Sequence, residues 1–334
     1  MRTTVSGTVR GKPLQWRRRI AMRKRYICLL LLLLITFSGC RAESLTEKQN
    51  ESPEDALTAI ALPIDFTGGS VGAEEGYLTE MSYQDPTIRV EITENDGSAY
   101  NSRYKGRDVT YWVADIWIGD ASQLRTAPAV SFDKNSAAPI DRIAERVNAI
   151  LAINGDFTTR LNDGIIIRQG ITYRNKLKSR RDVLLIDEDG DFHAYHLPED
   201  GEIEDTVDGK QVINAFYFGP ILVEDGEIPD PLPSFTFLKP EKYYARIAIC
   251  QVGKLHYKII LTTTEQGYTM GLKLEDFAQL CKDEGAQIAY NLDGGLSTSL
   301  YFQHRRINGQ HKVNFRDIPD IIYFASAWNG GDGE

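Results

Sequence analysis

The stretch 291–299 combines the residue types that a site for an anionic ligand needs. An apolar segment ends at Leu292 and is followed by Asp293, Gly294 and Gly295. Adjacent glycines let a backbone approach a ligand closely and expose N–H groups that can bind a phosphate, while a carboxylate can act as a base or a nucleophile. The polar residues that would complete the edge of such a pocket are Asn291, Ser297 and Thr298. The alternative interpretation is a simple Asp-Gly turn between two strands.

Two other places put polar side chains next to an apolar strand. Asn154, Gly155 and Asp156 follow the apolar stretch 149–153, where the simpler interpretation is an Asn-Gly turn. Arg246 is the first charged residue of the strand sequence Arg-Ile-Ala-Ile-Cys, and its alternative is an edge-strand arginine that faces solvent. Each of the two places is a weak indication by itself.

Glu265 follows three threonines at the end of another apolar strand, and its alternative is a solvated turn carboxylate. The five histidines show none of the spacings typical of metal ligands, and the sequence contains neither a P-loop nor a Gly-x-Ser-x-Gly elbow. These absences argue against a nucleoside triphosphatase and a serine hydrolase. We therefore expect no metal site and no cofactor. A divalent ion between carboxylates and a phosphate would be compatible with the sequence, but no ligand spacing demands one.

The elements that position these residues are many strands and few helices. Apolar residues at helical spacing predict helices over 140–148 and 272–284. The acidic segment 199–209 is predicted to be a surface loop. Runs rich in β-branched and aromatic residues predict strands at 88–92, 110–118, 149–153, 165–167, 171–173, 183–186, 192–196, 215–218, 221–223, 245–252, 255–263 and 287–292. This order favours an α+β fold, with a mixed, mostly antiparallel sheet flanked by a few helices, over a doubly wound parallel fold.

The chain divides into three segments of different composition. Residues 1–39 hold nine basic residues and no acidic one, and they end in a short apolar stretch, as in a lipoprotein-type signal peptide. Phe-Ser-Gly-Cys resembles a bacterial lipobox, which would make Cys40 the acylated first residue of the mature protein. The alternative is an uncleaved anchor helix, and both interpretations place the body outside the cytoplasm, anchored to the membrane. Residues 40–76 are predicted to be a tether and lead-in, and residues 77–329 the folded domain.

Charge and cysteine content limit the partners of this body. The formal net charge of the chain is −9, but from Cys40 onward 29 basic residues face 47 acidic ones, a net charge of −18. Because nucleic-acid binding needs a basic surface, we exclude a nucleic-acid partner. Only Cys250 and Cys281 remain in the body, and their apolar surroundings favour buried free thiols over a disulfide.

Six segments in a fixed order carry a family resemblance. They are AINGDF at 152–157, GIIIRQGITYR at 164–174, FGPILVEDGEI at 218–228, RIAIC at 246–250, GLKLEDFAQLCKDEGAQIAYNLDGGLSTSL at 271–300 and RDIPDIIYF at 316–324. Together they resemble the phosphodiester glycosidase family over about residues 111–324. Four features depart from the family pattern. Leu296 and Cys250 stand where the family has glycines, Asn154-Gly155-Asp156-Phe157 replaces an Asn-Gly-Gly-Phe or Asn-Gly-Asp-Tyr pattern, and no arginine stands beside Gly267.

The resemblance implies hydrolysis of a sugar-1-phosphodiester at its anomeric carbon–oxygen bond, which releases a sugar and a phosphomonoester. Because a phosphate leaving group is weakly basic, stabilising its charge should matter more than protonating it. We expect Arg246 and the N–H groups of Gly294 and Gly295 to bind the phosphate, and Asp293 to act as base or nucleophile. The residues expected to assist are two candidate carboxylate partners, Asp156 and Glu265, and the sugar-binding residues Asn154, Gly155, Asn291, Ser297 and Thr298.

A second function fits the same residues. A surface lipoprotein that binds a sugar phosphate or an exopolysaccharide without turnover would need the same loop, so the number of carboxylates separates the two hypotheses. Two carboxylates within reach of one anomeric position favour the enzyme, whereas an isolated Asp293 favours the binding protein. The acidic body also disfavours a polyanionic phosphopolysaccharide substrate, whose attraction local cations would have to provide.

Overall fold

Two long neighbouring strands lie in the largest sheet of the protein, and buried and more exposed side chains alternate along the first of them. The computed structural model describes residues 77–101, 109–199, 201–232, 238–263, 271–308 and 315–328. In strand β3 (Ile88–Asp96), Ile88, Val90 and Ile92 are buried and the residues between them are more exposed. Its neighbour β4 (Thr110–Ile118) pairs with it over its whole length. This two-residue period is what a sheet with one buried face requires.

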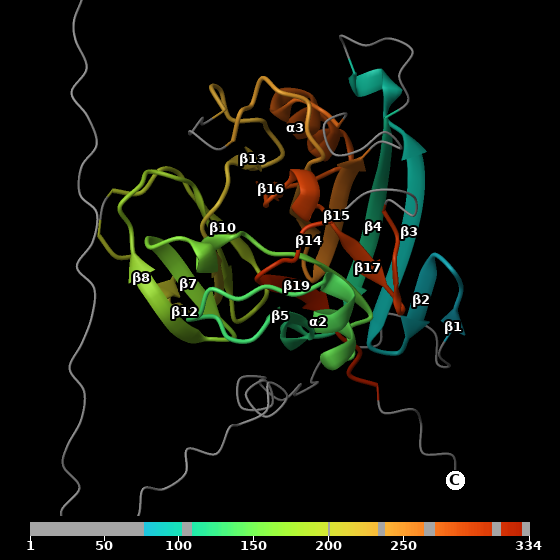
Figure 1. Ribbon diagram of the computed structural model, residues 1–334, viewed down its shortest axis with the longest axis horizontal. Helices are drawn as coiled ribbons and strands as arrows, with labels where there is room; N and C mark the ends of the chain where they lie inside the picture. Colours follow the sequence, from blue (N-terminus) through green and yellow to red (C-terminus); the bar gives the residue numbers. More distant parts are fainter. Residues whose placement is uncertain are drawn as a thin grey trace, which may run out of the picture. The chain divides into compact units, whose positions relative to one another are not determined.

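The first sheet has eight strands in the order β1-β2-β3-β4-β15-β14-β16-β13. All seven neighbouring pairs are antiparallel. Figure 1 shows strands β1 to β4 on its right-hand side. The strands not yet given bounds are β1 (Tyr77–Leu78), β2 (Ser82–Asp85), β13 (Ile221–Val223), β14 (Ile247–Gly253), β15 (His256–Thr263) and β16 (Ile288–Asn291).

Two smaller antiparallel sheets complete the architecture. The second sheet has the order β10-β9-β12-β7-β8, with β11 paired to β12, and the third has the order β18-β17-β6-β19-β5. The strands of the second sheet are β7 (Gly164–Arg168), β8 (Ile171–Lys176), β9 (Val183–Asp187), β10 (Phe192–Tyr195), β11 (Thr206–Val207) and β12 (Lys210–Phe216). Those of the third are β5 (Leu124–Pro128), β6 (Leu151–Asn154), β17 (Leu300–Phe302), β18 (Arg305–Arg306) and β19 (Asp320–Phe324).

The described residues contain two α-helices, α2 (Ile140–Arg146) and α3 (Leu274–Asp283). Pro139 stands directly before α2, where the lack of an N–H group costs nothing. Among these residues, no helix has the length and apolar character needed to cross a membrane. The short 3₁₀ helices are η1 (Ser98–Tyr100), η2 (Ala121–Gln123), η3 (Thr158–Arg160) and η5 (Gly295–Ser297).

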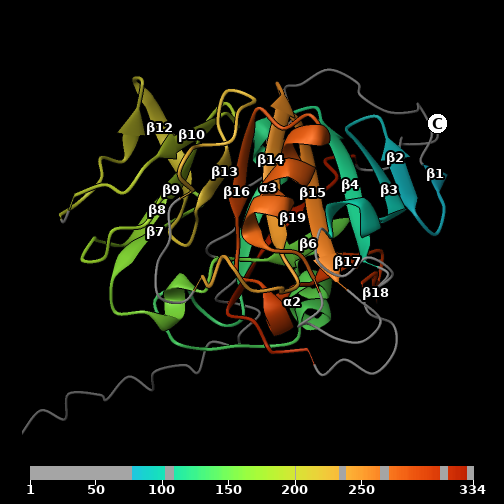
Figure 2. The ribbon, with the colours of Figure 1, turned by 90° about the horizontal axis from the view of Figure 1, so that it is seen from above.

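The core is layered between these elements. Apolar side chains of the first and third sheets meet in one large cluster that includes Ile116, Ile249 and Ile322. Helix α3 packs through Phe277 on the other face of the first sheet, as Figure 2 shows, and α2 packs on the other face of the third. This order of layers leaves the ends of strands from all three sheets close together at one edge.

The fold class is confirmed in part. The strand pairings are mostly antiparallel and the helices few, as expected, but the protein is richer in strand than an α+β fold, and all described pairings are antiparallel. The short strand β11 lies inside the segment predicted to be a loop. The sequence did not predict six further strands: β1, β2, β5, β17, β18 and β19. Cys250 and Cys281 are buried free thiols, as expected. The predicted signal peptide, the tether and Cys40 lie outside the described residues.

A buried arginine joins the second sheet to the third. Arg168, the last residue of β7, places Nη2 3.1 Å from an oxygen of Asp156 and 3.2 Å from an oxygen of Asp320, and all three side chains are fully buried. Its Nη1 donates to the carbonyl groups of Ile167 and Ala215. Asp156 follows β6 and Asp320 opens β19, so one guanidinium holds two strand ends of the third sheet.

Burial dominates the titration of Asp320. Loss of solvent raises its pKa to about 6; the Arg168 charge opposes this rise, and the negative charges of Asp156 and Asp293 add to it. The side chain also lies against Gly155, because a Cβ atom at that position would stand 2.3 Å from Asp320 Oδ1. The ionic group therefore depends on a glycine as well as on Arg168.

We predict that Arg168→Met lowers the free energy of unfolding by about 3–5 kcal/mol at pH 7, because it leaves two buried carboxylates without their cation. The loss should shrink at pH 5, where Asp320, whose pKa lies above its usual range, takes up a proton. Urea unfolding at both pH values measures this. The triple variant Arg168→Met, Asp156→Asn, Asp320→Asn should recover part of the loss, and a single-variant loss below about 1 kcal/mol would contradict the account.

Candidate active site

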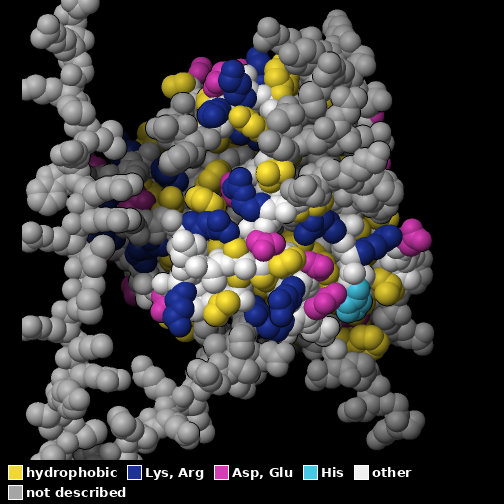
Figure 3. Space-filling model, viewed as in Figure 1, with side chains coloured by type: hydrophobic (Ala, Val, Ile, Leu, Met, Phe, Trp, Pro, Cys, Tyr) yellow, Lys and Arg dark blue, Asp and Glu magenta, His cyan; other side chains and the backbone are white. Residues whose placement is uncertain are grey.

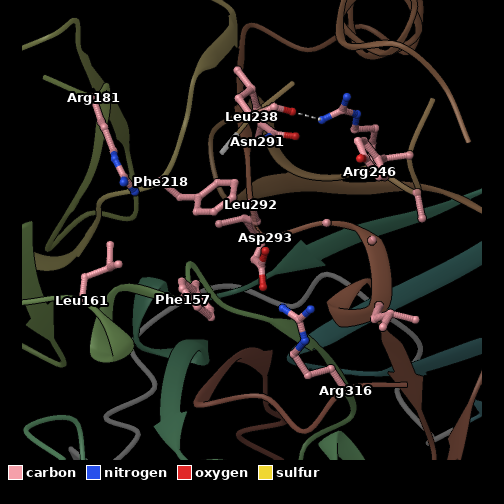
Figure 4. A pocket seen from close by; sticks show the side chains of 15 residues that line it. Phe157, Leu161, Arg181, Phe218, Leu238, Arg246, Asn291, Leu292, Asp293 and Arg316 are labelled. Atoms are coloured by element: carbon pink, nitrogen blue, oxygen red, sulfur yellow. Dashed lines mark hydrogen bonds between the residues drawn. The ribbon is translucent and has the colours of Figure 1, made fainter. Parts of the chain in front are cut away.

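A pocket of about 310 Å³ lies where strand ends of the three sheets meet. This volume suits a small ligand such as a sugar phosphate. Its wall comes from segments far apart in the sequence, and Figure 4 shows their side chains around a common space. The lining residues are Phe157, Leu161, Arg181, Phe218, Leu238, Tyr244, Ala245, Arg246, Asn291, Leu292, Asp293, Gly294, Gly295, Leu296 and Arg316.

Backbone contacts fix the position of Asp293 at the end of β16. The carbonyl oxygen of Asp293 accepts a 2.7 Å hydrogen bond from Asn154 Nδ2, which ties it to the third sheet. The N–H group of Gly295 donates to the carbonyl of Ala245 at 2.8 Å. A Cβ atom at Gly294 would stand 2.6 Å from that same carbonyl oxygen, so the close approach requires glycine. The loop is thus held from both sides, and its carboxylate faces the pocket.

The surroundings of Asp293 raise its pKa to about 6, from an ordinary value near 4. Burial is the main cause, and the negative charge of Asp156 adds to it. A hydrogen bond from Ser297 and the positive charges of Arg316 and Arg160 act in the opposite direction. A carboxylate that titrates near pH 6 can exchange a proton efficiently at neutral pH.

Arg246 lines the pocket, but its guanidinium is engaged in holding the wall. Its nitrogens donate to the carbonyl groups of Leu238, Lys239, Lys242 and Leu272 at 3.0–3.3 Å, and Figure 4 shows the bond to Leu238. Burial lowers the pKa of Arg246 to about 10, so the side chain stays charged at neutral pH. Arg246 therefore supplies positive charge to the pocket and positions the segment that carries Leu238.

Two further arginines, unnoticed in the sequence, face the same space. Arg181 comes from the segment before β9, and its guanidinium lies over the ring of Tyr217 at 5.4 Å. Arg316 precedes β19, and Figure 4 shows it directed toward Asp293 from the opposite wall. Arg316 opens the motif RDIPDIIYF, which is the one sign in the sequence that pointed to it. Three guanidinium groups and one carboxylate give the described pocket wall a net positive charge.

The rest of the wall is apolar, with one amide group. Phe157 adopts a left-handed backbone conformation, φ 67°, which is rare for an aromatic residue and is typical of functional sites. Phe157 and Phe218 present aromatic rings to the pocket. Asn291 donates through Nδ2 to the carbonyl of Gly219 at 2.8 Å, while its Oδ1 accepts no hydrogen bond from any described residue. That oxygen is available to a ligand hydroxyl or amide.

Five of the twelve residues predicted for function line the pocket, and the others lie behind it or outside the described residues. Those in the wall are Arg246, Asn291, Asp293, Gly294 and Gly295. Leu296, one departure from the family pattern, also lines it. The buried residues outside the wall are Asn154, Gly155, Asp156, Ser297 and Thr298. Glu265 and Cys40 lie outside the described residues.

Asp156 forms hydrogen bonds within the protein, so it supports the pocket wall and does not contact a substrate. One carboxylate oxygen accepts from Arg168 and from the N–H group of Thr158, and the other accepts from the N–H group of Tyr217 at 2.8 Å. Asn154 likewise uses both ends of its amide within the protein. In the part of the chain that the structure describes, Asp293 is therefore the one carboxylate in the pocket wall, and no group of three acidic, histidine or cysteine side chains is arranged for a metal ion.

A family model described as phosphodiester glycosidase matches residues 147–325, more than half of the chain. The protein belongs to the phosphodiester glycosidase family. This match spans every wall residue of the pocket, from Phe157 to Arg316. A search of curated protein sequences gave no match.

Solved structures align with this family member to different extents. The catalytic domain of zebrafish N-acetylglucosamine-1-phosphodiester alpha-N-acetylglucosaminidase, auto-inhibited by its pro-peptide, aligns with a TM-score of 0.57 at 15% identity, over 83% of this chain and 93% of that chain. A hypothetical protein from Synechocystis aligns with a TM-score of 0.47 at 17% identity, over 72% of this chain and 62% of that chain. A putative exported protein from Burkholderia pseudomallei aligns with a TM-score of 0.45 at 13% identity, over 65% of this chain and 74% of that chain. At 15% identity, the zebrafish enzyme establishes a common fold.

We predict that Asp293→Asn stabilises the protein at pH 7. A folded-state pKa raised to about 6 means that the native state binds a proton more tightly than the unfolded chain, so wild-type stability falls as pH rises from about 4 to 6. Asparagine does not ionise, so the variant does not lose stability over this pH range through residue 293. The expected gain at pH 7 is about 1–2 kcal/mol, below the roughly 3 kcal/mol of a fully buried group, because Asp293 is partly exposed at the pocket.

Thermal or urea unfolding between pH 4 and pH 8 measures this difference. Asp225→Asn, at an exposed turn, is the matched control and should leave the pH dependence unchanged. Equal pH profiles for wild type and Asp293→Asn would contradict a raised pKa at this position.

Proposed function

We propose that the protein is an extracytoplasmic hydrolase that cleaves a sugar-1-phosphodiester to a free sugar and a phosphomonoester. The observation that carries the proposal is the pairing, in one pocket, of a carboxylate of raised pKa with three guanidinium groups. The anion would lie among the arginines and the anomeric carbon near Asp293. Family membership and the activity named for the zebrafish enzyme of the same fold support this substrate class.

Asp293 acts as the general base in this proposal. Its carboxylate accepts a proton from a water molecule as the water oxygen forms a bond to the anomeric carbon. The bond from that carbon to the bridging oxygen breaks, and its electron pair remains on the oxygen of the departing phosphate. A carboxylate with a pKa near 6 is largely ionised at pH 7 and still basic enough to take the proton.

By carboxylate number alone, a described pocket wall with only Asp293 favours the binding protein. The enzymatic proposal stands on a different argument, which is that a phosphate leaving group does not need protonation by a second carboxyl group. Ordinary glycosidases need a second carboxyl group to protonate a strongly basic alkoxide. A phosphomonoester leaves with its charge stabilised by guanidinium groups, which can bind two phosphate oxygens at once. Arg316 and Arg181, on opposite walls, suit this task, and Arg246 adds charge from the wall that it organises.

The apolar part of the pocket is suited to a sugar ring. Phe157 and Phe218 offer aromatic faces that can pack on the C–H groups of a pyranose, and Asn291 Oδ1 can accept a hydrogen bond from a hydroxyl or acetamido N–H group. Ser297 orients the Asp293 carboxylate by a hydrogen bond. Its role is thus to support the base, and a direct contact with the sugar is not required.

We predict that the protein released by truncation before Cys40 hydrolyses an α-N-acetylglucosaminyl phosphodiester. Asp293→Asn should lower kcat by about 10²–10⁴ and Arg316→Ala by about 10²–10³. The rate should rise with pH up to about 6, where Asp293 loses its proton. Proton NMR of the first product should show inverted anomeric configuration, since water attacks directly.

Arg89→Ala, on the far strand β3, is the control and should retain full activity. Binding of sugar phosphodiesters without turnover of any of them would overturn the enzymatic proposal and favour the non-catalytic, exopolysaccharide-binding alternative. Retained configuration would overturn the role of Asp293 as a base.

The proposed location is the outer surface of a bacterial membrane, with the domain held by a lipid on Cys40. The support is the basic and apolar leader before a Phe-Ser-Gly-Cys sequence. We predict that Cys40→Ser prevents acylation, which metabolic labelling with a fatty acid measures. Cys250→Ser should leave labelling unchanged, because that thiol is buried. Equal labelling of wild type and Cys40→Ser would contradict the anchor.

A further inference from the structure

One edge of the pocket carries a basic strip on an otherwise acidic protein. The strip consists of Lys176, the last residue of β8, and of Lys178 and Arg180 in the segment between β8 and β9. All three are exposed, and the segment continues to Arg181 in the pocket wall. None of the three exposed cations forms an ion pair with a described acidic residue, whereas Lys210, Lys254 and Lys282 elsewhere each do. Arg180 donates to the carbonyl group of Leu197. Figure 3 shows Lys and Arg side chains interspersed with acidic and apolar ones on the face viewed there.

Contacts place this strip next to the pocket. Arg174, inside β8, donates to the carbonyl groups of Thr158 and Leu161, and Leu161 lines the pocket. Lys176 pairs in register with Gly164, and the hydroxyl of Ser179 donates to Asp163 at 2.5 Å. The strip thus runs along the loop that forms the wall beside Arg181.

The spacing of the cations suits a linear anion. Alternate residues of an extended segment point to the same side, and here Leu177 is buried while Lys176 and Lys178 are exposed. The repeat along such a segment is about 6.6 Å. Positive groups at this spacing, leading away from a phosphate-binding pocket, would contact further negative groups on the far side of the scissile phosphate.

We propose that the substrate is a sugar-1-phosphodiester whose aglycone carries additional phosphate groups, and that Lys176, Lys178 and Arg180 bind them. This inference rests on the proposed hydrolytic function. The net charge of −18 beyond residue 39 repels such a polyanion at long range, so a local strip of unpaired cations is what recognition requires. A neutral aglycone would leave the strip without a ligand.

Two substrates with the same sugar test the proposal. One has a methyl aglycone and the other an aglycone of three glycerol phosphate units. The triple variant Lys176→Gln, Lys178→Gln, Arg180→Gln should lose on the order of tenfold in kcat/KM on the phosphorylated substrate and less than twofold on the methyl substrate. Added salt should weaken wild-type turnover of the phosphorylated substrate alone.

A control variant loses the same number of positive charges, three, at positions on the first sheet and α3. It is the triple variant Arg89→Gln, Lys254→Gln, Lys282→Gln, which should behave as wild type on both substrates. Equal losses on both substrates in the strip variant, or no loss on either, would overturn the proposal.

A binding measurement separates this proposal from the enzymatic one. Fluorescein-labelled inorganic polyphosphate should bind wild type more tightly than the strip variant, as measured by anisotropy at low salt. If neither substrate is hydrolysed and this difference persists, the hydrolytic function fails and the anion-binding strip stands. If both proteins bind polyphosphate equally, the strip is an ordinary solvated surface.

Discussion

The arrangement of the pocket depends on the buried guanidinium of Arg168. It lies between Asp156 and Asp320, and each of these carboxylates belongs to a strand end that also supports the site. Asp156 fixes the backbone of Thr158 and Tyr217, which are the immediate neighbours of the wall residues Phe157 and Phe218. Asp320 lies against Gly155. Burying three charges is costly unless all are paired, so this group holds only one arrangement of the second and third sheets.

The buried ionic group of Arg168, Asp156 and Asp320 also affects the protonation of the pocket carboxylate. Burial raises the pKa of Asp293 to about 6, and the negative charge of Asp156 adds to the rise. Arg316 acts against the rise, so the carboxylate remains largely ionised at neutral pH. The pocket is positive although the body of the protein carries a charge of −18. Local placement of Arg181, Arg246 and Arg316 outweighs the overall charge because near charges in a partly enclosed site are weakly screened.

The sequence predicted the centre of the site but not its surroundings. Asp293 with its two glycines follows an apolar strand, a local pattern that can be recognised without a structure, and β4, β13 and both helices were predicted close to their observed bounds. Arg181 and Arg316 were missed because they reach the pocket from other sheets. Asp156 was expected at the reaction centre, and its partner Arg168, distant in the chain, could not be foreseen. Arg246 was expected to face a phosphate, yet four backbone carbonyls engage it.

The account depends most directly on the state of the Asp293 carboxylate. It is measured by carbon NMR of protein labelled at the aspartate carboxyl carbons, titrated from pH 3 to pH 8, with Asp293→Asn to assign the resonance. The account predicts a pKa of about 6 for Asp293. A value near 4, the ordinary value of an exposed aspartate, would contradict it.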